Sequence, residues 1–261
     1  MIQMGRGSAV KEPSGRADLG FAPIAPKRAF EEITEQIRQL LANGDLKPGD
    51  RLPAEADLAV RFSVSRNTLR EALRALELAG IVELRKGASG GAYVRQGSSG
   101  VIVTGLRDLY HLGAINPDQL TEARIWLESV VVRVACERAT EQELDALDAN
   151  VTAAAKAEKA GDFVRRTELH REFHLMLAAT TGNPIVQIMM ESVMEVLKQF
   201  VGAIGPANNP FTIPSKRRLL RLIRARDSEK AVGEMTRFLE KLHARYMERW
   251  TVEKLNERAG S

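Results

Sequence analysis

Residues 65–80 constrain the fold more than any other stretch, because they predict a capped helix with two unlike faces. Ser65 is a good N-cap and Gly80 a good stop, with no helix breaker between them. Such a helix packs on a small core and offers guanidinium groups to an anionic partner; taken alone, it is equally typical of a solvated amphipathic helix. At helical spacing, Leu69, Leu73 and Leu76 share the apolar face, and Arg66, Arg70 and Arg74 share the charged face.

The charged face suits nucleic acid. Arginine donates two parallel hydrogen bonds from a planar fork, which matches guanine edges and phosphates. Asn67, near the start of the helix, is the side chain best suited to adenine. Residues 61–95 hold seven basic residues against three acidic ones, a net charge of +4 within that short span. A local basic surface of this kind is typical of a DNA-binding domain.

The flanking sequence predicts a winged helix-turn-helix over residues 27–96. Apolar spacing predicts helices over residues 27–42 and 54–62 ahead of the arginine-lined helix. After Gly80 the period changes, and residues 81–84 and 92–94 read as two strands around a glycine-rich turn. Three helices followed by a hairpin are the layout of this DNA-binding fold. Residues 1–26, rich in Gly, Ser, Pro and charge, are expected to be a disordered tail.

Within this region the chain resembles the DNA-binding domain of the GntR family of bacterial transcription regulators. The resemblance is carried by L-K-P-G-D-R-L-P-A-E, by L-A-V-R-F-S-V-S-R-N-T-L-R-E-A-L-R-A-L-E-L-A-G and by G-A-S-G-G-A-Y-V. It implies that Ser65, Arg66 and Arg70 contact operator DNA, and that Lys86 and Gly87 enter the minor groove. Family members often carry Arg where this chain has Ala56, and Arg51 is expected to replace part of that contact.

The second half predicts an all-α domain, so the fold class is mainly α. Residues 97–115 are expected to be a linker, with a short helix over 101–112. From residue 116 to 258 six helices form an effector-binding and dimerisation bundle, and one of them is expected over residues 216–226 after a loop over 205–214. Asn116 is expected to cap the first of these helices, and Thr140 and Glu143 to form a capping box at the second. The middle of the first, residues 126–135, is apolar nearly all round and is expected to be buried.

This bundle resembles the FCD effector domain of the FadR subfamily. The resemblance is carried by L-T-E-A-R-I-W-L-E, by F-H-L-M-L-A-A-T-T-G-N-P and by R-R-L-L-R-L-I-R-A-R-D. Many such domains hold a divalent metal with one Asp and three His. Here His170 replaces the Asp, His174 is retained, and Lys216 and Phe238 replace the other two ligands. An ammonium has no lone pair and phenylalanine no donor atom, so His170 and His174 are at most a two-point metal site, and two hydrogen-bonded pocket histidines are preferred.

Helical periodicity points Arg124 and Lys216 inward, beside the two histidines. Unpaired charge inside an apolar bundle costs several kcal/mol per ion. One hypothesis is that an anionic effector compensates these cations, in a pocket formed by Arg124, His170, His174, Lys216 and Phe238 that needs no metal. The alternative, held equally, is that Lys216 extends outward or pairs with an acidic neighbour.

The rival class is a metalloenzyme, because His170 and His174 have the spacing of H-E-x-x-H zincins. There the Glu follows the first His, whereas here Arg171 does, and no third ligand is evident. Cys136 is the only cysteine, which excludes a disulfide framework. No run of apolar residues approaches the ~18 needed to cross a membrane, and no signal core is present, so a cytoplasmic location is expected.

The sequence therefore predicts a homodimeric, ligand-responsive regulator, not an enzyme, that binds a palindromic double-stranded operator. A repressor released by a small anionic metabolite is favoured, with an activator or dual regulator as the alternative. A carboxylate, a sugar acid and an acyl-CoA all remain open as effector. The operator, the target genes and any bound metal stay undetermined.

Overall fold

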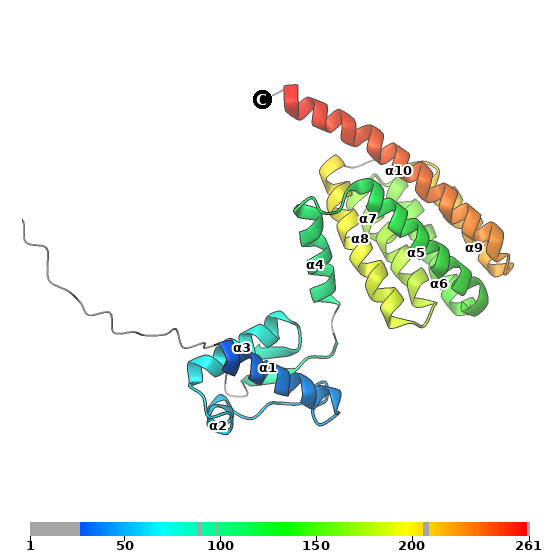
Figure 1. The fold of residues 1–261 in the computed structure, drawn as a ribbon. Helices are drawn as coiled ribbons and strands as arrows, with labels where there is room; N and C mark the ends of the chain where they lie inside the picture. Colours follow the sequence, from blue (N-terminus) through cyan, green and yellow to red (C-terminus); the bar gives the residue numbers. More distant parts are fainter. Residues whose placement is uncertain (1–26, 88–89, 98, 206–208, 260–261) are drawn as a thin grey trace, which may run out of the picture. The chain divides into compact units, whose positions relative to one another are not determined.

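A computed structural model describes residues 27–87, 90–97, 99–205 and 209–259 (Figure 1). The predicted tail, residues 1–26, and residues 88–89 of the wing lie outside the described residues. The chain divides into two compact units, residues 1–96 and 97–261. The described residues form ten helices and two strands, so the mainly α fold class is confirmed.

The first unit is a winged helix-turn-helix. Its elements are α1 Lys27–Ala42, α2 Glu55–Arg61, α3 Arg66–Leu78, β1 Val82–Arg85 and β2 Gly91–Val94. The strands pair antiparallel, with Val82 opposite Val94 and Arg85 opposite Gly91. The three helices and the hairpin share one apolar core, to which α1 contributes Ile33 and Ile37 and α3 contributes Leu69, Leu73 and Leu76.

Local chemistry accounts for the start of α3. The Ser65 hydroxyl accepts a hydrogen bond from the Thr68 amide at 3.1 Å, which satisfies one of the free N–H groups of the first turn. The preceding Ser63 has a φ of 53°, so the chain reverses tightly between α2 and α3. The turn thus orients α3 with its leucines on the core and its arginines outward.

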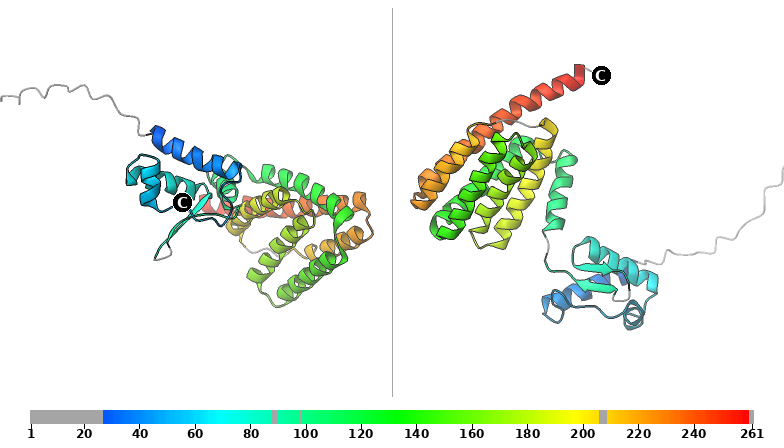
Figure 2. Two further views of the ribbon diagram at one scale, coloured as in Figure 1. Left: turned by 90° about the horizontal axis from the view of Figure 1, so that it is seen from below. Right: turned by 180° about the vertical axis from the view of Figure 1, so that it is seen from behind.

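The second unit is an all-α bundle. It contains α4 Gly100–His111, α5 Pro117–Arg138, α6 Glu141–Lys159, α7 Phe163–Ala179, α8 Pro184–Ile204, α9 Thr212–Arg224 and α10 Ser228–Ala259. The predicted capping box is present at Thr140, which exchanges hydrogen bonds with Glu143, and the predicted cap at Asn116 is also a full capping box, formed with Gln119. The segment expected to be a linker forms α4, which packs along α8 as part of this unit (Figure 2).

Two expectations about the bundle are wrong. Helix α9 begins at Thr212, not at Lys216, because Pro214 lies in its first turn, where the missing N–H costs nothing. The middle of α5 is not buried all round, since Trp126 is 63% exposed and Val130 53% exposed. The opposite face of α5 carries the buried residues, including Leu120, Val131 and Val132.

No helix among the described residues combines the length and the apolar character needed to span a bilayer.

Candidate DNA-binding helix and buried cavity

The outer face of α3 presents the predicted DNA-contacting residues. Arg66, Asn67, Arg70 and Arg74 are all exposed. The Arg70 Nε donates to the Glu55 carboxylate of α2 at 2.8 Å, so this side chain is held by a neighbouring helix. The Ser65 hydroxyl is engaged within the protein as the helix cap, and it also lies 2.9 Å from the Thr68 hydroxyl.

The wing is organised around Tyr93. The guanidinium groups of Arg51 and Arg85 lie 5.8 and 4.2 Å from its ring centroid. Arg51 also donates to the Gly90 carbonyl oxygen and forms a β-bridge with Tyr93. The Arg51 side chain is therefore exposed and at the same time held against the backbone of the wing. Lys86 and Gly87 are exposed at the end of the hairpin, and Gly87 has a φ of 100°, which a glycine adopts without strain.

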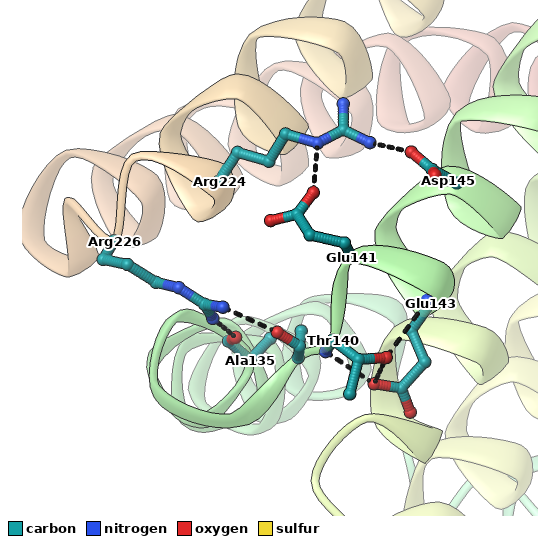
Figure 3. A network of polar contacts seen from close by, with 8 residues as sticks. Ala135, Thr140, Glu141, Glu143, Asp145, Arg224 and Arg226 are labelled. Atoms are coloured by element: carbon teal, nitrogen blue, oxygen red, sulfur yellow. Dashed lines mark hydrogen bonds and ion pairs between the residues drawn. The ribbon is translucent and has the colours of Figure 1, made fainter.

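The arginines of α9 form ion pairs inside the second unit. Arg218 binds Glu234 at 2.8 Å, and Arg224 bonds the carboxylates of Glu141 and Asp145 on α6 (Figure 3). Arg226, just after the helix, donates to the backbone carbonyls at the end of α5 (Figure 3). These contacts hold α9 and the chain after it against α5 and α6.

The second unit contains a cavity of about 1230 Å³. All seven helices of the unit, α4 to α10, contribute side chains to the lining, and α6 contributes only Glu158. Its lining includes all five residues predicted for the effector pocket, which are Arg124, His170, His174, Lys216 and Phe238. Apolar side chains such as Leu197 and Val201 of α8, and Leu242 and Trp250 of α10, line it as well.

A buried polar cluster centres on His174. Arg124 Nη2 lies 3.1 Å from His174 Nε2, and because arginine can only donate, Nε2 is the acceptor. The ring proton therefore sits on Nδ1, which lies 2.6 Å from Glu128 Oε1, although not in regular hydrogen-bond geometry. Arg124 Nε also donates to Glu128 at 3.3 Å. The Glu128 Oε2 atom is buried and has no hydrogen-bond partner among the described residues.

Lys216 is buried without a direct ion pair among the described residues. It is 2% exposed, so the reading in which it extends outward is wrong. Its Nζ lies 3.4 Å from His170 Nδ1, 3.3 Å from the His170 carbonyl oxygen and 4.1 Å from the Phe173 ring centroid. Among the described residues no carboxylate oxygen lies within 4.0 Å of the Lys216 Nζ atom. The alternative in which Lys216 forms an ion pair with an acidic neighbour is therefore also wrong.

Burial governs the protonation of this cluster. Burial, reinforced by Arg124 and only partly offset by Glu128, lowers the pKa of Lys216 well below its usual value. Burial also lowers the pKa of His170 to about 2 and that of His174 to about 4, so both rings are neutral at pH 7. Burial alone would raise the pKa of Glu128, but His174 and Arg124 outweigh it and the pKa is lowered.

The residues at the four positions that bind metal in related domains do not fit a metal. The His174 Nε2 lone pair faces Arg124, and the His170 Nδ1 lone pair faces Lys216. Phe238 stacks on the His174 ring at 6.5 Å and offers no donor atom. No group of three or more His, Cys, Asp or Glu side chains suited to a metal occurs among the described residues.

The structure adds residues that the sequence pattern did not single out. Glu128 lies one helical turn after Arg124, and this i,i+4 spacing of opposite charges was a signal that could have found it. Tyr110 and His111 of α4 line the cavity, and Arg166 is buried at its wall. No local signal marks these three, because only the packing of α4 and α7 in the bundle brings them there.

Comparisons with known proteins match both units. Residues 29–94 match the family model described as "Bacterial regulatory proteins, gntR family", and residues 119–241 match the FCD domain. The HTH-type transcriptional repressor NanR of Cronobacter sakazakii is 30% identical over 226 residues, which cover 82% of this chain and 83% of NanR. The HTH-type transcriptional regulator YcbG of Bacillus subtilis is 28% identical over 87% of this chain and 93% of its own length.

A solved structure shares the fold. Streptococcus agalactiae GntR superposes with a TM-score of 0.63 at 24% identity, covering 82% of this chain and 99% of that chain. At this identity the likeness concerns the fold alone.

Proposed function

Since this chain belongs to the GntR family and is a ligand-responsive DNA-binding transcription regulator with an FCD domain, not an enzyme, we propose that it is a repressor that an anionic effector releases from DNA. In this proposal Arg124 and Lys216 bind the anion directly, without a metal. The similarity to two relatives that are named transcriptional repressors supports repression over activation.

One observation carries the effector proposal: a buried lysine lines a cavity and has no carboxylate within ion-pair distance among the described residues. Arg124 has Glu128 as its partner, whereas Lys216 meets only an imidazole, a carbonyl oxygen and a ring. A buried charge is tolerated when it is paired, and a bound carboxylate or phosphate would supply the missing partner. The free Nη1 donor of Arg124, which bonds no described residue, would bind the same anion.

For DNA, we propose that Arg66, Asn67 and Arg70 read base edges in the major groove, while Lys86, Gly87 and Arg51 approach the backbone and minor groove. Ser65 is placed beside them at the helix start. A homodimer would place two α3 helices on the halves of a palindromic site. The exposed Trp126 and Val130, one turn apart on α5, support an apolar contact between subunits.

Fluorescence anisotropy with the DNA upstream of the chain's own gene tests this proposal. We expect salt-sensitive binding that is lost when Arg66 and Arg70 are both replaced by Ala. Candidate carboxylates, sugar acids and acyl-CoAs that release the wild type should fail to release Lys216→Ala and Arg124→Ala. Arg217→Ala is the matched control, since Arg217 adjoins Lys216 in α9 but is exposed. Unchanged release of the Lys216 and Arg124 variants would contradict the pocket.

A further inference from the structure

We propose that Lys216 forms an imine with a carbonyl-containing effector, a 2-oxo acid, whose carboxylate is held by Arg124 in the same cavity. This inference rests on the proposed anion-binding role of the cavity and adds a covalent bond to it. The two side chains come from α9 and α5, and both line the cavity.

The surroundings of Nζ are those of a nucleophilic lysine. An amine reacts with a carbonyl only in its uncharged form, which desolvation and a nearby cation favour. Lys216 has both conditions, since it is 2% exposed and Arg124 depresses its pKa further. No described carboxylate lies within ion-pair distance of Nζ, and Glu128, which raises the pKa of Lys216 from farther away, is itself paired with Arg124.

The hydrogen bonds leave a lone pair for the reaction. An uncharged amine has two N–H bonds, and two acceptors lie within reach of Nζ, namely the His170 Nδ1 atom and the His170 carbonyl oxygen. In the tautomer of His170 that carries its proton on Nε2, both N–H bonds of the amine are directed there and the nitrogen lone pair is left for the carbonyl. His170 is neutral and serves to orient the amine, not to deprotonate it.

The reaction balances without a co-reactant. The Nζ lone pair attacks the carbonyl carbon, and the carbonyl π electrons move to the oxygen. Both amine hydrogens then transfer to that oxygen, which leaves as water while the C=N bond forms. No electron acceptor or donor is consumed, and the bond reverses by hydrolysis, as reversible control by an effector requires.

The carboxylate beside the carbonyl explains why a 2-oxo acid fits better than a simple aldehyde. Arg124 bonds Glu128 through Nε and His174 through Nη2, which leaves Nη1 to bind the acid. Apolar walls formed by Leu197, Val201 and Leu242 would contact the rest of the molecule. The cavity, at about 1230 Å³, accepts an oxo acid with a bulky apolar or aromatic body.

Reductive trapping tests the imine on the full chain. The protein is incubated with pyruvate, 2-oxobutyrate or phenylglyoxylate together with sodium cyanoborohydride, and then analysed by intact mass and peptide mapping. We expect one added group for at least one acid, dependent on the reductant and located on Lys216. Lys216→Arg keeps a long side chain with N–H donors but cannot form an imine, so it should lose the adduct. Lys198→Arg is the matched control, since Lys198 lines the same cavity but is exposed, and trapping should persist.

A parallel measurement separates this inference from the proposed function. Lactate and mandelate carry the carboxylate but a hydroxyl in place of the 2-oxo group, so they cannot form an imine. They report anion binding alone, through the midpoint of thermal unfolding and through release of the protein from DNA. If these hydroxy acids act as strongly as the oxo acids and Lys216 carries no adduct, the imine is overturned while the anion pocket stands. Absence of any adduct, or adducts spread evenly over exposed lysines, also overturns the imine.

Discussion

The Nζ atom of Lys216 lies 3.4 Å from Nδ1 of His170, which places a buried lysine amine against a neutral imidazole at a position where related domains use metal ligands. A lysine and a metal can each attract an anion to the same point of the bundle. The substitution therefore preserves the attraction for an anion while it changes the chemistry from coordination to hydrogen bonding.

Replacing Lys216 by Met should stabilise the protein. The variant removes a buried amine whose charged form burial disfavours, while it keeps the volume, and replacing buried ionic groups by apolar residues gains about 1–4 kcal/mol. Because the folded pKa of Lys216 lies below its unfolded value, the cost is full at low pH and vanishes as the pH rises to about 10.5. Urea unfolding at several pH values should show the advantage of the variant shrinking towards alkaline pH. A variant less stable than the wild type at pH 7 would contradict this.

The histidines should make the fold sensitive to acid. The folded pKa of His174, about 4, lies below its unfolded value of about 6.5, so the stability that it contributes is complete above pH 6.5. Between pH 6.5 and 4 the unfolded chain binds the extra proton, and stability should fall by up to about 1.4 kcal/mol per pH unit for this residue. His174→Gln should give a shallower slope over that window in urea titrations. An unchanged slope would place the acid sensitivity elsewhere.

Glu55 should tune DNA recognition through Arg70. The ion pair is exposed, so Glu55→Gln should change the free energy of unfolding by less than about 1 kcal/mol. Freed of the carboxylate, Arg70 should bind phosphates more readily. We therefore expect tighter binding to non-specific DNA, with a steeper salt dependence and a lower specificity ratio, in anisotropy titrations. Glu71→Gln, an exposed change on α3 itself, controls for the lost negative charge. Equal effects of both variants would show that only net charge matters.

Arg226 should be a structural residue of the bundle. Its guanidinium donates to the carbonyls of Cys136 and Ala139 at 3.0 and 2.8 Å, which satisfies free C=O groups at the end of α5. Arg226→Ala should lower the free energy of unfolding by about 1–3 kcal/mol. Arg221→Ala, an exposed change in α9, should stay within about 0.5 kcal/mol of the wild type. Similar losses for the two variants in urea titrations would argue against this role.

Trp126 should be part of the subunit contact. A tryptophan that is 63% exposed beside Val130 is the kind of apolar surface that a symmetric partner covers. Trp126→Glu should shift the chain from dimer to monomer in light scattering and weaken operator binding. Val60→Glu, at an exposed apolar position on α2, should leave the dimer intact. A dimer that survives Trp126→Glu would move the interface to another face.

The local amino-acid sequence determined most of the helices, because helix caps and apolar periodicity depend on residues only a few positions apart. The caps at Ser65 and Asn116, the capping box at Thr140, and the leucine stripe of α3 were all predictable, and so were the fold class and the inward direction of Arg124 and Lys216. The bounds of α9 were predicted less well, since Pro214 signals either a break or a first turn until its neighbours are known.

Tertiary structure alone decided what surrounds each of these side chains. An apolar pattern cannot say whether Trp126 faces the core or the surface, because that depends on which helices pack around α5. Nor can it say that Lys216 meets His170 without any carboxylate, or that α4 supplies Tyr110 to the cavity, because these residues lie far apart in the chain. Hydrogen-bonded turns are set by near neighbours, whereas the charge and shape of a cavity are set by the packing of whole helices.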